Sequence, residues 1–306
     1  MLGAVLAASA TAGSVAAPAR NGEIVFAGVR AATGPNRFFD LYLMRADGTR
    51  VRRITGSRAW ERYPTWSPDG RWIAYISDRS RPGHEGSYEI YVMRPNGSGL
   101  RRLTRDRWID DQLAWSPDGR QLAFSSSRAS GRFGISVMNV NGTGFRRLTH
   151  DGEGLPAWSP DGSTIAYERF NPRLGTSGTH ELWLMNPEGS NRRQLTFPPQ
   201  ADSGPDADDY MPEWSPSGDE LAFARRYRGR TDIHVIRPDG SGLRRLTRQA
   251  GQHTWPAWSP DGTRIAFVTA LGRRRSVYAM NVDGSRLKRL TAGGVEYAYP
   301  DWQPLR

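Results

Sequence analysis

The chain alternates short apolar segments with polar turns at a nearly constant interval. Five of these segments share an Ile/Leu-Ala-Tyr/Phe core, at residues 73–75, 122–124, 165–167, 221–223 and 265–267. Each is only a few residues long and bounded by turn-forming residues, which is typical of β-strands. No later stretch is long and apolar enough for a membrane-spanning helix. The pattern predicts an all-β fold.

A second apolar segment follows each of these cores, and the Glu23–Val29 segment fits the first series. The second segments begin at Leu41, Ile90, Ile135, Leu182, Ile233 and Val277. A glycine turn comes next, usually Asp-Gly or Asn-Gly, and these dipeptides form tight hairpins. An Arg-rich segment ending in Thr then closes the unit, as in Arg102-Leu103-Thr104. Each unit therefore predicts three consecutive antiparallel strands, which we call B, C and D.

A tryptophan motif supplies the strand before B, called A. Trp-Ser-Pro-Asp-Gly begins at Trp66, Trp115, Trp158 and Trp258, Ser replaces Asp in the copy at Trp214, and a shortened copy begins at Trp302. The copies lie about 45 residues apart, an interval typical of β-propeller blades. The first unit has no strand A, and the last copy has nothing after its strand A. We therefore predict a six-bladed β-propeller of four-stranded antiparallel blades over residues 20–306, with one blade closed by both chain ends.

The motifs Trp-Ser-Pro-Asp-Gly, Ile-Ala-Tyr/Phe and Arg-Arg-Leu-Thr resemble those of TolB-like propellers, also described as WD40-like repeats with a Pro-Asp signature. The resemblance covers residues 23–306. It implies the propeller fold. TolB carries an α/β domain before its propeller, and no stretch of this sequence matches that domain, so the resemblance concerns the propeller part only. The six repeated tryptophans are expected to be structural, filling the space between neighbouring blades.

Charge and the first residues refine this picture. The net charge is +11, Lys288 is the single lysine and there is no cysteine. A basic chain can bind nucleic acid. However, a basic pair recurs in every strand D, as Arg-Arg in five units and Lys288-Arg289 in the last. This spreads the charge around the rim and argues against nucleic-acid binding. Residues 1–19 are Ala-rich and uncharged, which predicts a secretory signal, with a flexible tail as the alternative. We therefore expect a periplasmic or secreted protein that is monomeric.

The candidate site lies on the face formed by the B–C and D–A loops, because the long loops are all there, at residues 29–40, 78–88, 168–181 and 197–211. Function tends to lie on such loops. Counting back five residues from each Trp gives Glu61, Asp110, Glu153, Asp209, His253 and Tyr297. Sixfold symmetry should bring them around one channel mouth. Loop aromatics accompany them: Trp60, Tyr63, Trp108, Tyr210, Trp255 and Tyr299.

Two interpretations are possible for Glu61, Asp110, Glu153 and Asp209, which we call the mouth acids. They can bond the loop backbone or pair with Arg79, Arg128, Arg169 and Arg225. Alternatively, with His253, they bind a cationic group or a metal ion, for which oxygen ligands favour Ca²⁺. The predicted function is a non-enzymatic binding scaffold that recognises a protein or peptide on this face. The alternative is a channel-site enzyme, such as a metal-dependent polysaccharide lyase or hydrolase.

Overall fold

The computed structural model describes residues 20–29, 38–82, 88–106, 108–128, 132–150, 152–172, 179–197, 207–292 and 296–305. Most of the long loops and all of residues 1–19, the predicted signal or tail, lie outside these ranges. Among the described residues, no helix is long and apolar enough to cross a membrane.

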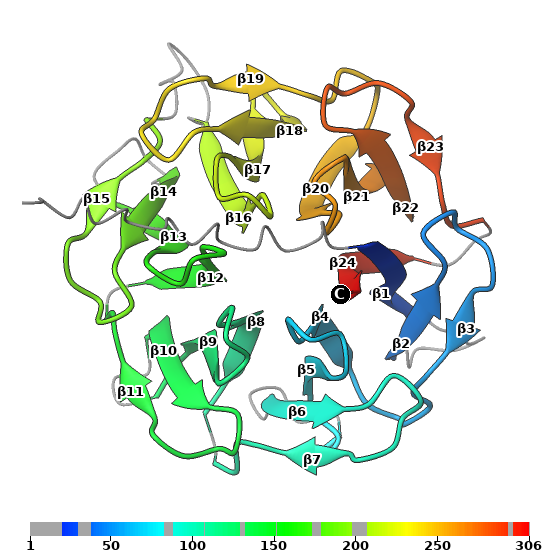
Figure 1. The fold of residues 1–306 in the computed structure, drawn as a ribbon, viewed down its shortest axis with the longest axis vertical. Coiled ribbons are helices and arrows are strands. Elements are labelled where there is room, and N and C mark those ends of the chain that lie inside the picture. The colour runs from blue at the N-terminus through cyan, green and yellow to red at the C-terminus, as the bar shows by residue number, and fades with distance from the viewer. Residues whose placement is uncertain are drawn as a thin grey trace, which may run out of the picture.

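Six four-stranded antiparallel sheets surround a central axis (Figure 1). The innermost strands are β4 (Glu61–Trp66), β8 (Asp110–Trp115), β12 (Glu153–Trp158), β16 (Asp208–Trp214), β20 (Gln252–Trp258) and β24 (Tyr297–Leu305). The second strands are β1 (Arg20–Val29), β5 (Ile73–Ser77), β9 (Gln121–Ser126), β13 (Ile165–Asn171), β17 (Leu221–Tyr227) and β21 (Arg264–Leu271). The third strands are β2 (Phe39–Met44), β6 (Glu89–Met93), β10 (Gly134–Asn139), β14 (Thr179–Met185), β18 (Arg230–Ile236) and β22 (Arg274–Asn281). The outer strands are β3 (Arg52–Arg53), β7 (Arg101–Arg102), β11 (Arg146–Arg147), β15 (Arg193–Gln194), β19 (Arg244–Arg245) and β23 (Lys288–Arg289). The six-bladed prediction is confirmed.

The two chain ends close the ring in a shared blade, as the missing first strand A predicted. The C-terminal strand β24 is the inner strand of the sheet β24-β1-β2-β3, and it lies beside β1 in Figure 1. Ile24 pairs with Trp302, and Arg20 pairs with Leu305. This blade therefore has no free inner edge.

The repeated tryptophans pack between neighbouring blades. Trp66 shares a buried cluster with Val25 and Leu43 of the preceding blade. Trp302, which is 2% exposed, packs among residues of its own blade and of the β20–β23 blade. The indole nitrogens of three of them also donate to a carbonyl of the preceding inner strand at 3.2 Å, namely Trp115, Trp214 and Trp302. A ring of this size once per blade fills the wedge between adjacent sheets.

Five of the six outer strands link their blade to the next. The first residue of the outer strand donates to a backbone carbonyl in the C–D turn of the following blade: Arg52 to Pro95, Arg146 to Pro187, Arg193 to Pro238, Arg244 to Val282 and Lys288 to Asp47. The link from Lys288 to Asp47 joins the last blade to the first. These basic side chains around the rim are thus engaged in the same kind of hydrogen bond to a neighbouring blade.

The closing Thr of each unit has a structural role, and all of these Thr residues except Thr55 are buried. Its hydroxyl oxygen accepts a hydrogen bond from a backbone N–H of strand C at 2.8–3.0 Å, in the pairs Leu41–Thr55, Ile90–Thr104, Ile135–Thr149, Leu182–Thr196, Ile233–Thr247 and Val277–Thr291. A buried N–H without a partner is costly, which explains why Thr ends the motif.

Replacing Thr149 by Val should lower the free energy of unfolding by about 1–2 kcal/mol, because the buried N–H of Ile135 loses its acceptor. Urea denaturation measures this change. Thr149→Ser keeps the hydroxyl and should lose less. A Val variant as stable as the wild type would show that the N–H has found another partner.

Candidate functional site

The predicted mouth acids lie at the start of the inner strands, on the loop face. Glu61, Asp110, Glu153 and Asp209 are all buried, at 0–2% exposure. The geometry pairs three of them with arginines that follow or belong to the second strand of the same blade: Glu61 with Arg79, Asp110 with Arg128 at 2.8 Å, and Asp209 with Arg225 at 2.6 Å. Glu153 lies opposite Arg169 in the register of β12 and β13.

The Asp209–Arg225 pair is the best aligned of these. Arg225 donates from Nε to Oδ1 and from Nη2 to Oδ2, each at 2.6 Å, so the pair is bidentate. Asp110 accepts from Ser126 as well as from Arg128, and burial raises the pKa of Asp110 to about 6 despite the Arg128 charge. Such pairs brace the inner strand against the second strand.

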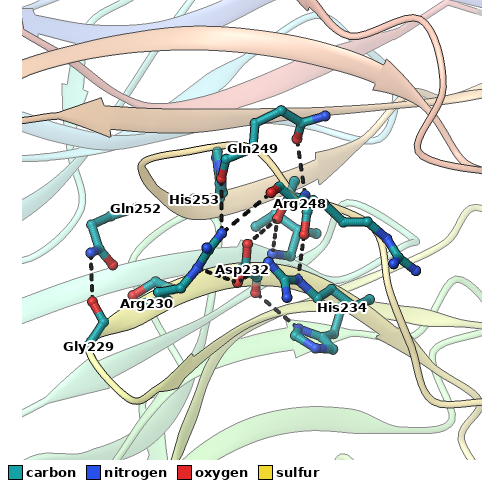
Figure 2. A network of polar contacts seen from close by, with 12 residues as sticks. Gly229, Arg230, Asp232, His234, Arg248, Gln249, Gln252 and His253 are labelled. Carbon is teal, nitrogen blue, oxygen red and sulfur yellow. Dashed lines mark hydrogen bonds and ion pairs between the residues drawn. The ribbon is translucent and has the colours of Figure 1, made fainter.

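His253 occupies the equivalent place in β20 and has neutral partners. Its ring nitrogens lie 3.1 Å from Thr269 Oγ1 and 3.2 Å from the Gln249 carbonyl oxygen. Figure 2 shows it above Asp232, which pairs with Arg230 and Arg245. Burial is the largest cause that lowers the pKa of His253. This histidine is therefore held neutral within the blade.

Within the described residues, no group of three or more His, Cys, Asp or Glu side chains is placed to hold a metal ion. The calcium-binding role of Glu61, Asp110, Glu153, Asp209 and His253 stays a prediction. The arginine pairs of the other interpretation are present for three of the acids.

A second ionic cluster on the loop face was not predicted. His180 Nδ1 lies 3.3 Å from Asp208 Oδ1, and His180 Nε2 lies 3.4 Å from Glu168 Oε1. Burial lowers the pKa of His180, but the hydrogen bond with Asp208 and the charge of Glu168 outweigh it and raise the pKa overall. The sequence does not predict this cluster, because its members come from three strands, β13, β14 and β16. The spacing of the histidines along the chain does not indicate that these strands bring the side chains together.

A repeated bulge shapes the central channel. Three residues before each Trp, the pairing of the inner strand with its neighbour shifts register. The residue there has a positive φ of 49–60° although none is glycine: Tyr63, Gln112, Leu155, Met211, Trp255 and Tyr299. A bulge re-aims side chains, and all six line the channel. The sequence signal was the proline that follows five of them, because Pro within a strand marks bulges.

Three of the predicted aromatics meet in this bulge ring. The ring centroids of Tyr63 and Tyr299 are 4.1 Å apart, those of Trp255 and Tyr299 4.5 Å, and those of Tyr63 and Trp255 5.2 Å. Burial raises the pKa of Tyr63 well above its usual value. The three rings form a contact cluster across three blades, although they are scattered in the sequence.

Trp60 belongs to an aromatic–arginine patch beside that cluster. The Arg62 guanidinium lies 4.5 Å from the ring centroid of Trp60, 5.4 Å from that of Tyr88 and 5.8 Å from that of Phe39. Burial raises the pKa of nearby Asp111 to about 7, which the Arg62 charge partly offsets. We call Phe39, Trp60, Arg62 and Tyr88 the Arg62 patch.

The other two predicted aromatics lie apart from the bulge ring. The Tyr210 hydroxyl is 3.2 Å from Thr231 Oγ1, and Tyr210 packs against the apolar cluster shared by its own blade and the β20–β23 blade. Trp108 lies in the loop before β8, where its backbone N–H donates to Asp106 Oδ1. Sequence position therefore identified loop-face aromatics but not their grouping.

Two acids inside the channel were missed. The channel encloses about 510 Å³ between the bulge ring and the prolines of the Ser-Pro-Asp-Gly turns. Glu213 and Asp301 line it, each one residue before its Trp, where the other blades carry Thr65, Ala114, Ala157 and Ala257. Burial raises the pKa of Glu213 to about 8, with the Asp301 charge adding to it, and burial raises the pKa of Asp301 to about 6.

Replacing Glu213 by Gln should stabilise the protein at high pH. A carboxyl whose pKa is raised on folding binds its proton more tightly in the folded state. Its contribution to stability is complete below about pH 4.5 and is lost as pH rises through about 8. Since the side chain reaches water in the channel, we expect a gain of about 1–3 kcal/mol at pH 9. At pH 4 the two proteins should be equally stable.

Urea denaturation at both pH values measures this difference. Glu220→Gln is the matched control, because Glu220 lies outside the channel and pairs with Arg244. A Glu213→Gln variant that is less stable than the wild type at pH 9 would mean that the channel carboxylate has a positive partner.

The chain is similar to known proteins of one family. The model of the TolB β-propeller domain matches residues 81–207 and 156–305. The chain belongs to this family. A TolB homologue of Chlorobium luteolum is 48% identical over 40 residues, which are 13% of this chain and 9% of that protein. The matched segment is thus a small part of the curated relative.

Solved structures agree on the fold. TolB from Acinetobacter baumannii superposes with a TM-score of 0.77 at 22% identity, over 92% of this chain and 66% of that one. An oligogalacturonate lyase in complex with manganese superposes with a TM-score of 0.56 at 16% identity, over 82% of this chain and 70% of that one. At these identities the likeness concerns the fold alone.

Proposed function

We propose that this TolB-family propeller is a non-enzymatic scaffold of the cell envelope that recognises a protein or peptide on its loop face. The observation that carries the proposal is the Arg62 patch, which adjoins the Tyr63–Trp255–Tyr299 cluster. Trp, Tyr and Arg are the residues most enriched at the energetic centres of protein interfaces. Here they lie together on a rigid ring.

The state of the mouth acids supports a binding role. Glu61, Asp110 and Asp209 are buried and engaged with arginines of their own blades. Their side chains brace the scaffold that presents the aromatic residues. A rigid scaffold lowers the entropy lost on binding, which favours recognition by a preformed surface.

Location in the envelope rests on the sequence. Residues 1–19 resemble the hydrophobic and cleavage regions of a secretory signal. We propose that the mature protein begins near Arg20, where β1 starts. N-terminal sequencing of the protein from its source organism tests this, and an intact Met1 in the cytosol would contradict it.

The alternative is a metal-dependent lyase or hydrolase at the channel. The fold likeness to the manganese-bound oligogalacturonate lyase favours it, at 16% identity. The two functions are separated by soaking crystals in Ca²⁺ and Mn²⁺. An ion with open coordination beside a basic group would favour catalysis.

A pull-down with matched variants tests the proposed function. The mature domain is used to capture partners from the envelope of the source organism, beside Arg62→Ala and Leu100→Ser. Leu100 is an exposed residue of the C–D turn in the same blade, on the opposite face. We expect one partner to bind the wild type and the Leu100 variant, and to bind Arg62→Ala at least about tenfold more weakly. A partner that is lost only with Leu100→Ser would contradict the loop-face assignment.

A further inference from the structure

The central channel contains a carboxyl group without a partner. The Glu213 side chain makes no hydrogen bond and no ion pair with any residue in the described part of the chain, and the charge of Asp301 adds to the effect of burial in raising its pKa. Asp301 differs, because Oδ2 accepts the N–H of Trp66 at 2.7 Å and Oδ1 accepts the N–H of Trp302 at 2.9 Å. Of the two channel acids, Glu213 is therefore the one whose carboxyl is available to a ligand.

The wall around these acids is apolar and roomy. At the same level, the other blades carry the small residues Thr65, Ala114, Ala157 and Ala257 in the channel lining. One end of the channel is lined by Tyr63, Trp255 and Tyr299, and the other by the prolines of the turns. A chamber of about 510 Å³ is within the range of small-molecule sites, which combine apolar walls with a few placed polar groups.

The two carboxyl groups of the channel, Glu213 and Asp301, favour a positively charged ligand. Two close carboxyl groups repel each other when both are ionised, so a positive group between them is favoured. The faces of Trp and Tyr rings also attract cations. A positive group favours the ionised form of both acids and lowers their pKa values, whereas an anion disfavours that form. A neutral apolar molecule would leave Glu213 unpaired.

The oxygen count favours an organic cation over a metal ion. Calcium takes six to eight oxygen ligands, whereas this level of the channel offers two carboxyls, one of which is already engaged by backbone N–H groups. No third acid or histidine joins them within the described ranges. An ammonium group needs only a few acceptors, and its hydrocarbon part can contact the rings.

We propose that the channel binds a primary ammonium group carried on an apolar or aromatic body, with Glu213 as its main acceptor, Asp301 as the second negative charge and the Tyr63–Trp255–Tyr299 cluster against its hydrocarbon part. The ammonium comes from a free amine or from a lysine side chain of a bound peptide. This site lies inside the ring, and its acceptors Glu213 and Asp301 are not part of the Arg62 patch on the loop face.

Isothermal titration calorimetry on residues 20–306 tests the site. The probes are phenethylamine, its neutral analogue 2-phenylethanol, CaCl₂, and a blocked five-residue peptide with one central lysine among alanines. The protein is the wild type, Glu213→Gln and the control Glu220→Gln, whose substituted acid pairs with Arg244 outside the channel. Gln keeps the size of Glu, and each protein is first checked for an intact fold by circular dichroism.

We expect the wild type and Glu220→Gln to bind phenethylamine or the lysine peptide, and Glu213→Gln to bind it at least tenfold more weakly. Binding of the free amine alone identifies a small-molecule site, and binding of the peptide alone identifies a partner's lysine as the source. Equal affinity for 2-phenylethanol, unchanged binding by Glu213→Gln, or absence of binding by both amine probes would overturn the proposal. Tight binding of Ca²⁺ that depends on Glu213 would replace it with a metal site. None of these outcomes depends on the pull-down result at Arg62.

Discussion

Deleting residues 298–306 should abolish cooperative folding of the whole ring at ambient temperature. The deletion removes almost all of β24, which is the inner strand of the closing blade. The buried side chains of Ile24 and Phe26 would lose Trp302, and both neighbouring blades would lose an inner contact. In a repeat array, loss of one interface removes the coupling between units, so the effect should extend beyond one blade.

Thermal denaturation followed by circular dichroism measures this effect. The control is Trp302→Phe in the full chain, which keeps β24 and shrinks one ring, and which should lower the midpoint without removing the transition. A truncated protein with the wild-type midpoint would contradict closure by the two chain ends.

Replacing Asp209 by Leu should destabilise the protein by about 3–5 kcal/mol, because the Arg225 guanidinium would be left buried and unpaired. Both residues lie in the interior, and each oxygen of Asp209 accepts one N–H of Arg225. The charge pair is therefore expected to be structural, as the equivalent pairs of Glu61 and Asp110 are.

The double variant Asp209→Leu, Arg225→Met is the control. It removes both charges and should recover most of the lost stability, because a hydrophobic pair of similar volume is often as stable as a buried ion pair. Urea denaturation of all three proteins gives the coupling energy. If Asp209→Leu alone were more stable than the wild type, the carboxylate would be a strained functional group, and the calcium interpretation of the mouth acids would gain support.

The sequence predicted the fold well because its signals are local and repeated. The Ser-Pro-Asp-Gly turns, the Asp-Gly hairpins and the apolar strand cores recur in nearly every unit. A strand or turn with a weak signal in one unit can therefore be assigned from the equivalent positions in the others. The first unit lacks a strand A, and the last Trp motif supplies a strand A with no strands after it. Together these features predicted the closing blade, which the pairing of Ile24 with Trp302 confirms.

The site was less predictable because it depends on where side chains point after the strands bend. Counting back from each Trp selected Glu61, Asp110 and Asp209, which the structure places in internal ion pairs. The bulge at the third residue before Trp turns Tyr63 and its equivalents toward the channel. Glu213 and Asp301 were overlooked because their positions carry Ala or Thr in the other blades, so no repeat pattern marks them.

The central claim is that a protein partner contacts the loop face at the Arg62 patch. Replacing Trp60 with a photoreactive phenylalanine derivative in the source organism tests it directly, with the same residue placed at Leu100 as the control on the opposite face of the same blade. We predict that irradiation yields a specific covalent adduct with one protein from position 60 and none from position 100. An adduct from position 100 alone, or none from position 60 in cells that contain the folded protein, would contradict the proposed function.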